Sequence, residues 1–256
     1  MDTKELIAKV KQKKELRGLP DNFIEEVIKE QIKNKGIQYH LLSKKEEKQL
    51  IKEVRAKLRI YVGQFHKPKS RHRFLEKDKI EELLKTHSST KERLPHYPIL
   101  KKIISNLKSS SILDLGCGLN PIAIANSETE YYAYDINESD IEIINLFFER
   151  YKIKGKAYVQ DIRKIEHFPK TDLCLLLKVI DVIENKGHKL AEIILKKLEC
   201  RHVIVSFSTK TLSGVPMRHP QRGWIERLCS RLGYKYNLVK TKNELFYIIE
   251  KSYKYL

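Results

Sequence analysis

The chain has 256 residues, of which 41% are hydrophobic and 33% are charged. These totals fit a globular protein with one domain and an extension. The longest apolar runs, at Leu173–Leu177 and Val203–Val205, are far shorter than a membrane span. The first residues lack the apolar segment of a signal peptide, so a cytoplasmic location and no membrane partner are expected.

The formal net charge of +18 is unevenly distributed along the chain. Residues 1–110 hold 28 Lys and Arg against 15 Asp and Glu, whereas residues 111–256 hold 23 against 18. This asymmetry predicts a polyanionic partner for the N-terminal half. A thermophile-like composition rich in Lys, Glu and Ile is the alternative, but it does not explain the imbalance between the halves.

Three amphipathic helices are predicted first, and they cover Lys4–Arg17, a stretch from a cap at Asp21 or Asn22 to Gly36, and Lys44 to about Tyr61. Ser43 with Glu46 three residues later is a capping box for the third. The basic run from His66 to Arg73 follows. Because Pro68 prevents a continuous helix there, the run predicts a phosphate-binding loop, and a solvated loop is the alternative.

From residue 111 onward, apolar runs alternate with helical stretches. The predicted strands are Ser111–Leu115, Tyr131–Tyr134, Ala157–Val159, Leu173–Leu177 and Val203–Phe207, and the clearest helices are Glu138–Tyr151 and Lys189–Leu198. This alternation predicts a parallel, doubly wound sheet with helices on both faces. Two late runs, Tyr234–Val239 and Leu245–Ile249, predict an antiparallel pair that completes seven strands. The predicted domains are a helical, basic unit at 1–108 and an α/β unit at 109–256.

A tight turn, Asp114-x-Gly116-x-Gly118, follows the first strand, and Asp135 ends the second. The two glycines let the backbone approach a ligand where a Cβ would collide. Asp135 can accept hydrogen bonds from both hydroxyls of a ribose. The pair predicts a site for S-adenosylmethionine (AdoMet). A nicotinamide site would need a third glycine, and Pro121 stands in its place.

Two further residues fit this cofactor. Asp161 ends the third strand, where a carboxylate faces the adenine amine; a simple helix cap is the alternative. Arg93, in a Ser/Thr-capped segment before the first strand, can clamp the AdoMet carboxylate in a bidentate pair. Four scattered cysteines with no Cys-x-x-Cys pair favour neither a zinc site nor a disulfide framework, so no metal is expected.

The segment from His87 to Pro95 resembles the His-x-Ser-Thr-Arg-Glu-Arg-Leu-Pro signature of the aminoglycoside-resistance 16S rRNA methyltransferases (the Arm/Rmt group, also called FmrO-like). The likeness continues, in the right order, through the stretches 114–121, 175–178, 205–214 and 244–247. It implies a seven-stranded Rossmann-like class I AdoMet methyltransferase with an N-terminal all-helical basic domain. It also implies methylation of N7 of a guanine in the decoding site of 16S rRNA in the small ribosomal subunit, with S-adenosylhomocysteine as coproduct.

The candidate site residues fall into three groups. The cofactor group comprises His87, Thr90, Arg93, Asp114, Gly116, Cys117, Gly118, Asp135, Ile136, Gln160, Asp161, Ile162 and Leu177. The target-base group comprises Lys178, Lys210 and Trp224, with Trp224 either stacking on a flipped guanine or packing in the core. The RNA-binding group comprises Lys67, Lys69, Arg71, Arg73, Arg218 and Arg222.

One segment departs from the family pattern. After Lys178 the family has apolar residues and then Pro-Cys, whereas this chain continues with Val179-Ile-Asp181-Val-Ile-Glu184. Because this stretch lies near the expected entry of the base, two alternatives stay open: a tRNA or another rRNA position as substrate, and a non-catalytic RNA-binding assembly factor. A resistance role and a housekeeping role are equally compatible with the sequence, and oligomeric state is not readable from it.

Overall fold

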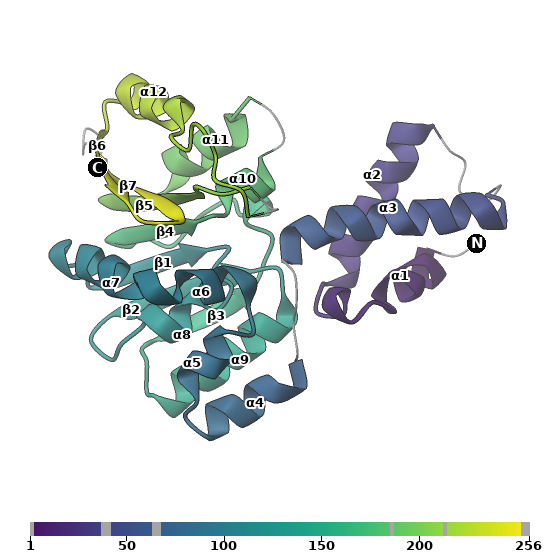
Figure 1. The fold of residues 1–256 in the computed structure, drawn as a ribbon, viewed down its shortest axis with the longest axis horizontal. Helices are drawn as coiled ribbons and strands as arrows, with labels where there is room; N and C mark the ends of the chain where they lie inside the picture. Colours follow the sequence, from purple (N-terminus) through teal and green to yellow (C-terminus); the bar gives the residue numbers. More distant parts are fainter. Residues whose placement is uncertain (1–2, 37–41, 63–67, 185–186, 212–213, 252–256) are drawn as a thin grey trace.

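The computed structural model describes residues 3–36, 42–62, 68–184, 187–211 and 214–251. Figure 1 shows two bodies, a group of three N-terminal helices beside a larger α/β body. The sheet of the α/β body has the strand order β3-β2-β1-β4-β5-β7-β6. The strands are β1 (Ser111–Leu115), β2 (Glu130–Asp135), β3 (Gly155–Val159), β4 (Leu173–Leu177), β5 (His202–Ser208), β6 (Lys235–Lys240) and β7 (Glu244–Glu250).

The strand directions confirm the predicted sheet. Strand β1 pairs in parallel with β2 and β4, β2 with β3, and β4 with β5. Strand β7 runs antiparallel to both β5 and β6, so the two late apolar runs form the expected antiparallel pair. The five upstream strands lie within two residues of the predicted bounds. Because the carboxyl ends of the parallel strands share one edge, the loops that follow β1, β2 and β4 meet there.

Helices cover both faces of the sheet. One face packs against α4 (Pro68–Glu76), α5 (Ile80–Leu84), α7 (Tyr97–Asn106), α8 (Asn120–Ile124) and α9 (Glu138–Arg150). The other packs against α10 (Ile180–Ile183), α11 (Lys189–Lys197) and α12 (Gly223–Leu232). The described residues also form the short helix α6 (Ser88–Arg93) and the 3₁₀ turns η1 (Lys14–Leu16), η3 (Leu94–His96) and η4 (Ile162–Lys164).

The N-terminal group has a hydrophobic core of its own, built by α1 (Thr3–Lys11), α2 (Asp21–Lys35) and α3 (Lys44–Val62). The capping box is confirmed, since the Ser43 backbone N–H donates to Glu46 Oε2 at 2.8 Å and the Glu46 N–H donates to Ser43 Oγ at 3.3 Å. Gly36 ends α2 in a left-handed conformation, as predicted. The predicted first helix is shorter, because the extended Lys13 backbone separates α1 from η1 and turns Leu16 into the core.

Two predictions for the N-terminal half were wrong. The run from His66 to Arg73 is not a loop throughout, because α4 begins at Pro68, whose fixed φ suits the first helical position. The domain boundary does not lie at residue 108. Leu75, Leu83 and Leu100 belong to the core of the sheet, so α4 to α7 are part of the α/β body and the helical unit ends with α3.

The two bodies meet along a short seam (Figure 1). The Gly18 carbonyl accepts the Glu138 N–H at 2.8 Å. The Arg163 guanidinium lies 5.4 Å from the ring centroids of both Phe23 and Tyr61. These contacts lock α2 and α3 against the loops that follow β2 and β3, and so fix the helical unit beside the carboxyl edge of the sheet.

Replacing Gly18 by alanine is expected to loosen this seam. A Cβ there would lie 2.5 Å from Asn137 Oδ1, the atom that caps α9. We expect a loss of about 1–3 kcal/mol in the free energy of unfolding, measured by urea denaturation. Gly223→Ala is the matched control, because its Cβ would meet only a flexible arginine tip at 3.2 Å. Equal stability of both variants would contradict the prediction.

Candidate active site

The turn after β1 brings two glycines against other parts of the chain. Gly116 and Gly118 have φ values of +66° and +51°, which glycine adopts without penalty. A Cβ on Gly116 would lie 2.4 Å from Val179 Cγ2, and one on Gly118 would lie 2.7 Å from His87 Cε1. The turn is therefore closed in by the loop after β4 and by the residue that precedes α6. No residue other than glycine fits this backbone path without a shift of its neighbours.

Asp135 at the end of β2 holds the glycine turn in place. Its Oδ2 accepts the Gly118 N–H at 2.9 Å, and its Oδ1 accepts the Asn137 N–H at 3.0 Å. Burial raises the pKa of Asp135 to about 6, and the nearby Asp140 carboxylate adds to the rise. The carboxylate therefore lies against the turn and accepts backbone hydrogen bonds on both of its oxygens.

Asp114 in β1 supplies a second buried carboxylate beneath the turn. It is fully buried, and its Oδ2 accepts the Tyr131 hydroxyl at 2.9 Å. Its Oδ1 is buried and has no hydrogen-bond partner among the described residues. Burial raises the pKa of Asp114 to about 7. An acceptor that lacks a donor, next to a turn closed to any Cβ, fits a cofactor that brings hydroxyl and amine donors.

Arg93 has a bidentate carboxylate partner, but a different one from that predicted. The side chain is fully buried in α6. Its Nε and Nη2 donate to Glu244 at 2.7–3.2 Å, and its Nη1 donates to Asn120 Oδ1 at 2.6 Å. The guanidinium fork thus faces an internal acid from β7. It ties the signature segment to the sheet, and a clamp on the AdoMet carboxylate stays a prediction.

The rest of the signature segment positions the turn. The His87 Nδ1 lies 3.0 Å from Ser89 Oγ, and its Nε2 lies 3.8 Å from Asp140 Oδ2. The Thr90 hydroxyl is buried and donates to the Leu84 carbonyl at 2.6 Å. His87 therefore borders the glycine turn, whereas the hydrogen bond of Thr90 ties the start of α6 to the end of α5.

The residues after β3 lie at the same edge of the sheet. The Gln160 N–H donates to the Asp135 carbonyl at 2.8 Å, and the Gln160 side chain is exposed. Asp161 caps η4 by accepting the Arg163 N–H at 3.0 Å, and its Oδ2 pairs with Arg163 Nη2 at 2.6 Å. The capping alternative therefore occurs, and contact with an adenine stays a prediction. Ile162 is buried.

Three apolar candidates line the backbone of the site. Cys117 is buried in the turn, and its thiol donates to the Gly118 carbonyl at 3.4 Å. Ile136, directly after Asp135, packs against the core of the N-terminal helices. Leu177 is buried at the end of β4. Ile136 is thus the candidate that joins the cofactor edge to the helical unit.

The predicted target-base residues lie on loops after β4 and β5. The Lys178 backbone is left-handed, with φ +59°, and its Nζ pairs with Glu92 Oε2 at 2.9 Å. Lys210 forms an isolated bridge with Pro216. One face of Trp224 is covered by the His188 ring, with the centroids 4.1 Å apart. Trp224 is partly buried and packs against the edge of the core of the sheet, and stacking on a base stays a prediction.

The six predicted RNA-binding residues divide between surface and interior. Lys67 lies outside the described residues, as does the side chain of Lys69. Arg73 and Arg218 are exposed. The prediction for Arg71 was wrong, because its side chain is 1% exposed and pairs with the buried Asp140.

Arg222 is also largely engaged within the protein. Its Nη2 donates to Asp181 Oδ2 at 3.0 Å, and its guanidinium lies 5.2 Å from the ring centroid of Phe207. It therefore fastens the loop after β5 to α10, and an RNA contact from it stays a prediction.

Several residues that shape the site could not be predicted from the sequence, because their roles depend on tertiary contacts. Val179 meets the turn only because the loop after β4 folds over it, and Tyr131 reaches Asp114 from the neighbouring strand. Glu244 lies 151 residues from Arg93, so its motif suggests nothing about that pairing. Among the described residues, no cluster of three or more His, Cys, Asp or Glu is placed to hold a metal. Over the same ranges, no helix is long and apolar enough to cross a membrane.

Solved structures define the class of fold. The chain aligns over 98% of its length with all of the 16S rRNA methyltransferase RmtF, solved in complex with S-adenosyl-L-homocysteine, at 23% identity and a TM-score of 0.81. It aligns with 99% of the 16S rRNA methylase RmtB, again over 98% of its own length, at 23% identity and a TM-score of 0.77. The strand order, the glycine turn and these likenesses define a class I AdoMet methyltransferase fold. Residues 76–248 match the FmrO family of ribosomal RNA methyltransferases, and the chain belongs to this family.

Curated relatives carry a more specific name. A 16S rRNA (guanine(1405)-N(7))-methyltransferase of Micromonospora rosea is 26% identical over 178 residues, which cover 66% of this chain and 64% of the relative. An enzyme of the same name from Serratia marcescens is 26% identical over 218 residues, 81% of this chain and 86% of that one. The chain thus spans slightly under two thirds of the length of the first of these relatives.

Proposed function

We propose that the chain transfers the methyl group of AdoMet to N7 of a guanine in the 16S rRNA of the small ribosomal subunit. The observation that carries this proposal is the closed glycine turn with its Asp135 brace, set within a chain of the FmrO family. The names of the relatives from Micromonospora rosea and Serratia marcescens support this choice of nucleotide and atom.

In this proposal the residues of the carboxyl edge bind and orient the cofactor. Asp135 accepts hydrogen bonds from the ribose hydroxyls, and Asp114 Oδ1, which has no partner among the described residues, accepts one from the cofactor. Gly116 and Gly118 admit the ligand close to the backbone. When bound, AdoMet supplies an activated methyl group on a sulfonium centre.

Methylation of guanine N7 requires no general acid or base from the protein. Guanine N7 has an in-plane lone pair and no proton, so no side chain must remove one. Rate enhancement then comes from alignment and from exclusion of water. N7 lies in the deep major groove of an RNA helix, so the guanine must be extruded or the helix distorted.

Cleavage of the modified rRNA tests this function directly. Small subunits incubated with protein and AdoMet are treated with borohydride and aniline, which cut RNA at N7-methylguanine, and the cut is read by primer extension. A single new stop at a decoding-site guanine is expected. Absence of any stop, with AdoMet consumed, would overturn the N7 assignment.

A second substrate is favoured by one feature of the loop after β4. Asp181 and Glu184 add acidic groups there, and Asp181 pairs with Arg222 instead of leaving an apolar surface. A tRNA or another rRNA position is the alternative substrate. Competition between small subunits and free tRNA for methyl transfer separates the two.

AdoMet affinity is expected to depend on pH through Asp135. The acceptor role requires the ionised carboxylate, and burial raises the pKa of Asp135 to about 6. The association constant should therefore fall as pH drops through that pKa, approaching about tenfold per pH unit below it, and should level off above it. Calorimetric titration measures it. A flat profile on both sides of the pKa of Asp135 would contradict this role.

A further inference from the structure

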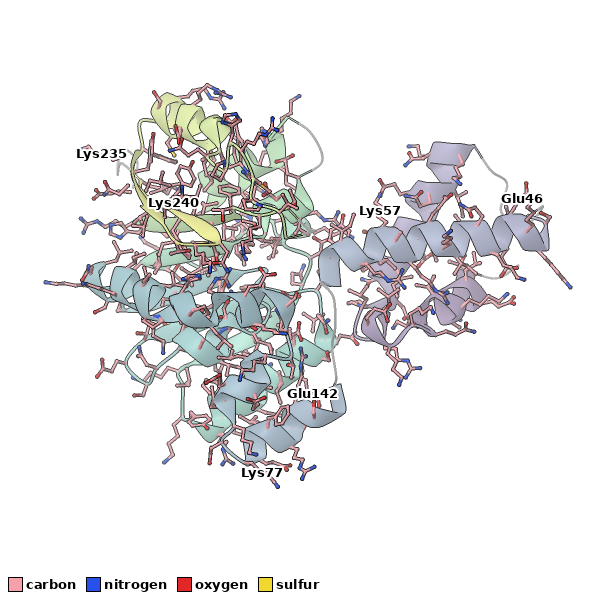
Figure 2. The ribbon with its side chains drawn as sticks, viewed as in Figure 1. Glu46, Lys57, Lys77, Glu142, Lys235 and Lys240 are labelled. Atoms are coloured by element: carbon pink, nitrogen blue, oxygen red, sulfur yellow. The ribbon has the colours of Figure 1, made fainter. Side chains whose placement is uncertain are left out.

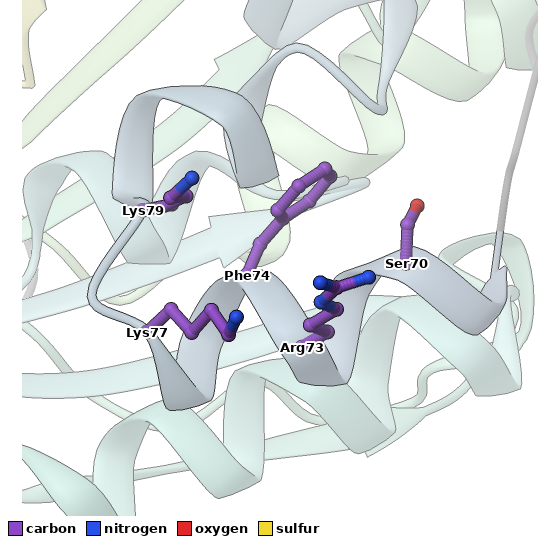
Figure 3. Close-up of a pocket in the computed structure, with 5 residues that line it drawn as sticks. All are labelled: Ser70, Arg73, Phe74, Lys77 and Lys79. Atoms are coloured by element: carbon purple, nitrogen blue, oxygen red, sulfur yellow. The ribbon is translucent and has the colours of Figure 1, made fainter.

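One face of α4 presents a pocket away from the glycine turn (Figure 3). Ser70, Arg73, Phe74 and Lys77 follow the spacing of a single helical face, and Lys79 joins them from the next turn of chain. These five residues line a pocket of about 350 Å³. Figure 3 shows Phe74 between the serine and the lysines, with Arg73 and Lys77 on the same side of the helix.

The opposite face of α4 is firmly anchored. Arg71 is buried and pairs with Asp140, and its Nε donates to Thr86 Oγ1 at 2.8 Å. Leu75 is buried in the core of the sheet. After the helix, Asp78 adopts a left-handed φ of +52°, and the Lys79 N–H donates to the Phe74 carbonyl at 2.8 Å. This end of the helix is a Schellman turn, and it fixes Lys79 beside the pocket.

The charges of the pocket are uncompensated. Arg73, Lys77 and Lys79 are exposed, and within the described ranges none has an acidic partner. The nearest turn carboxylate, Asp78, pairs with Arg150 at 3.1 Å and accepts the Tyr151 hydroxyl at 2.6 Å. Three cations around a half-buried phenyl ring repel one another, and a polyanion with an attached flat group relieves that repulsion.

The pocket shares a rigid body with the cofactor edge. Asp140, which pairs with Arg71 of α4, lies 3.8 Å from His87 Nε2. His87 in turn borders Gly118. Whatever binds on α4 is therefore held at a fixed distance from the methyl donor, and this serves the alignment that N7 transfer needs.

We infer that this pocket binds the sugar–phosphate backbone of the RNA substrate, with phosphates on Arg73, Lys77 and Lys79 and a ribose or base against Phe74. The inference rests on the proposed function for the identity of the RNA. Phosphates favour clustered Arg and Lys, and aromatic rings stack on bases without regard to sequence. The pocket thus acts as a second grip, separate from the N-terminal helices α1 to α3.

A triple variant tests the inference. Arg73→Ala/Lys77→Ala/Lys79→Ala removes the three pocket cations and leaves α4 anchored by Arg71. The matched control, Lys101→Ala/Lys102→Ala/Lys240→Ala, removes three exposed lysines on α7 and β6; Lys240 and Lys77 are labelled in Figure 2. Filter binding to purified small subunits over a salt series, methyl-transfer kinetics, and AdoMet titration are measured for both variants and the parent.

The expected result is specific to RNA binding. The pocket variant should bind small subunits about tenfold or more weakly, and the slope of log K against log salt should flatten by about two to three. Its KM for subunits should rise with kcat and AdoMet affinity unchanged. If the pocket variant binds as tightly as the control, the inference is overturned. If the parent binds subunits but transfers no methyl group, the proposed function fails while the binding comparison still decides the pocket.

Discussion

Replacement of Asp135 by alanine should abolish AdoMet binding at working concentrations. The change removes the acceptor for the ribose hydroxyls and also frees the N–H groups of Gly118 and Asn137, which lie 2.9 and 3.0 Å from the carboxylate. The two hydrogen bonds from the ribose hydroxyls to this charged acceptor are worth about 3 kcal/mol or more of binding free energy. Their loss lowers the AdoMet affinity at least about 100-fold. Asp135→Asn should be similarly defective, because its amide turns a donor toward one of these N–H groups.

Calorimetric titration with AdoMet and with S-adenosylhomocysteine measures this loss. Glu130→Gln is the matched control, because Glu130 lies at the other end of β2, where its side chain accepts the Tyr132 hydroxyl at 2.7 Å. Its AdoMet affinity should equal that of the parent. Tight binding by a folded Asp135→Ala protein would remove the basis of the cofactor site.

The sheet was readable from sequence because its signals are local. Five-residue apolar runs between turns mark buried parallel strands, and the chain alternates them with amphipathic helices. The glycine turn was equally readable. The φ values of Gly116 and Gly118 are ones that other residues rarely adopt, so the spacing itself carries the backbone geometry.

The residue with which each charged side chain pairs could not be predicted from the sequence, because the two members of a pair lie far apart in the chain. A basic run predicts cations at the surface, yet Arg71 meets Asp140, 69 residues away, in the interior. Nothing local separates it from Arg73, two positions on, which remains exposed. The same reason moved the domain boundary, since only the packed structure shows which apolar face α4 to α7 bury.

Arg93, the arginine of the signature segment, shows the same limit. A guanidinium in a capped segment before the sheet predicts a carboxylate partner, and Arg93 has one. The sequence suggested the cofactor as that carboxylate, whereas in the structure Arg93 pairs with Glu244 of β7, the last strand in the chain. The chemistry of the pair was therefore predictable, and its second member was not.

The Arg93–Glu244 pair should dominate the stability of the α/β body. Both side chains are at most 1% exposed, and Glu244 also accepts from Ser206 Oγ and lies 3.9 Å from Lys178 Nζ. Glu244→Gln leaves a buried guanidinium without a counter-charge. Such an orphaned charge costs about 3–5 kcal/mol. Glu250→Gln, in the exposed Arg201–Glu250 pair of the same strand, should cost less than about 1 kcal/mol.

The contribution of Glu244 to the free energy of unfolding should fall at acidic pH. Burial alone would raise the pKa of Glu244, but the charge of Arg93 and its hydrogen bonds hold that pKa below the ordinary value. A depressed pKa contributes stability that is present above the unfolded-state pKa and is lost as pH falls through the folded one. Urea unfolding at neutral and acidic pH should therefore show that Glu244→Gln removes part of the acid sensitivity. A variant as stable as Glu250→Gln at neutral pH would show that the pair contributes no net stability.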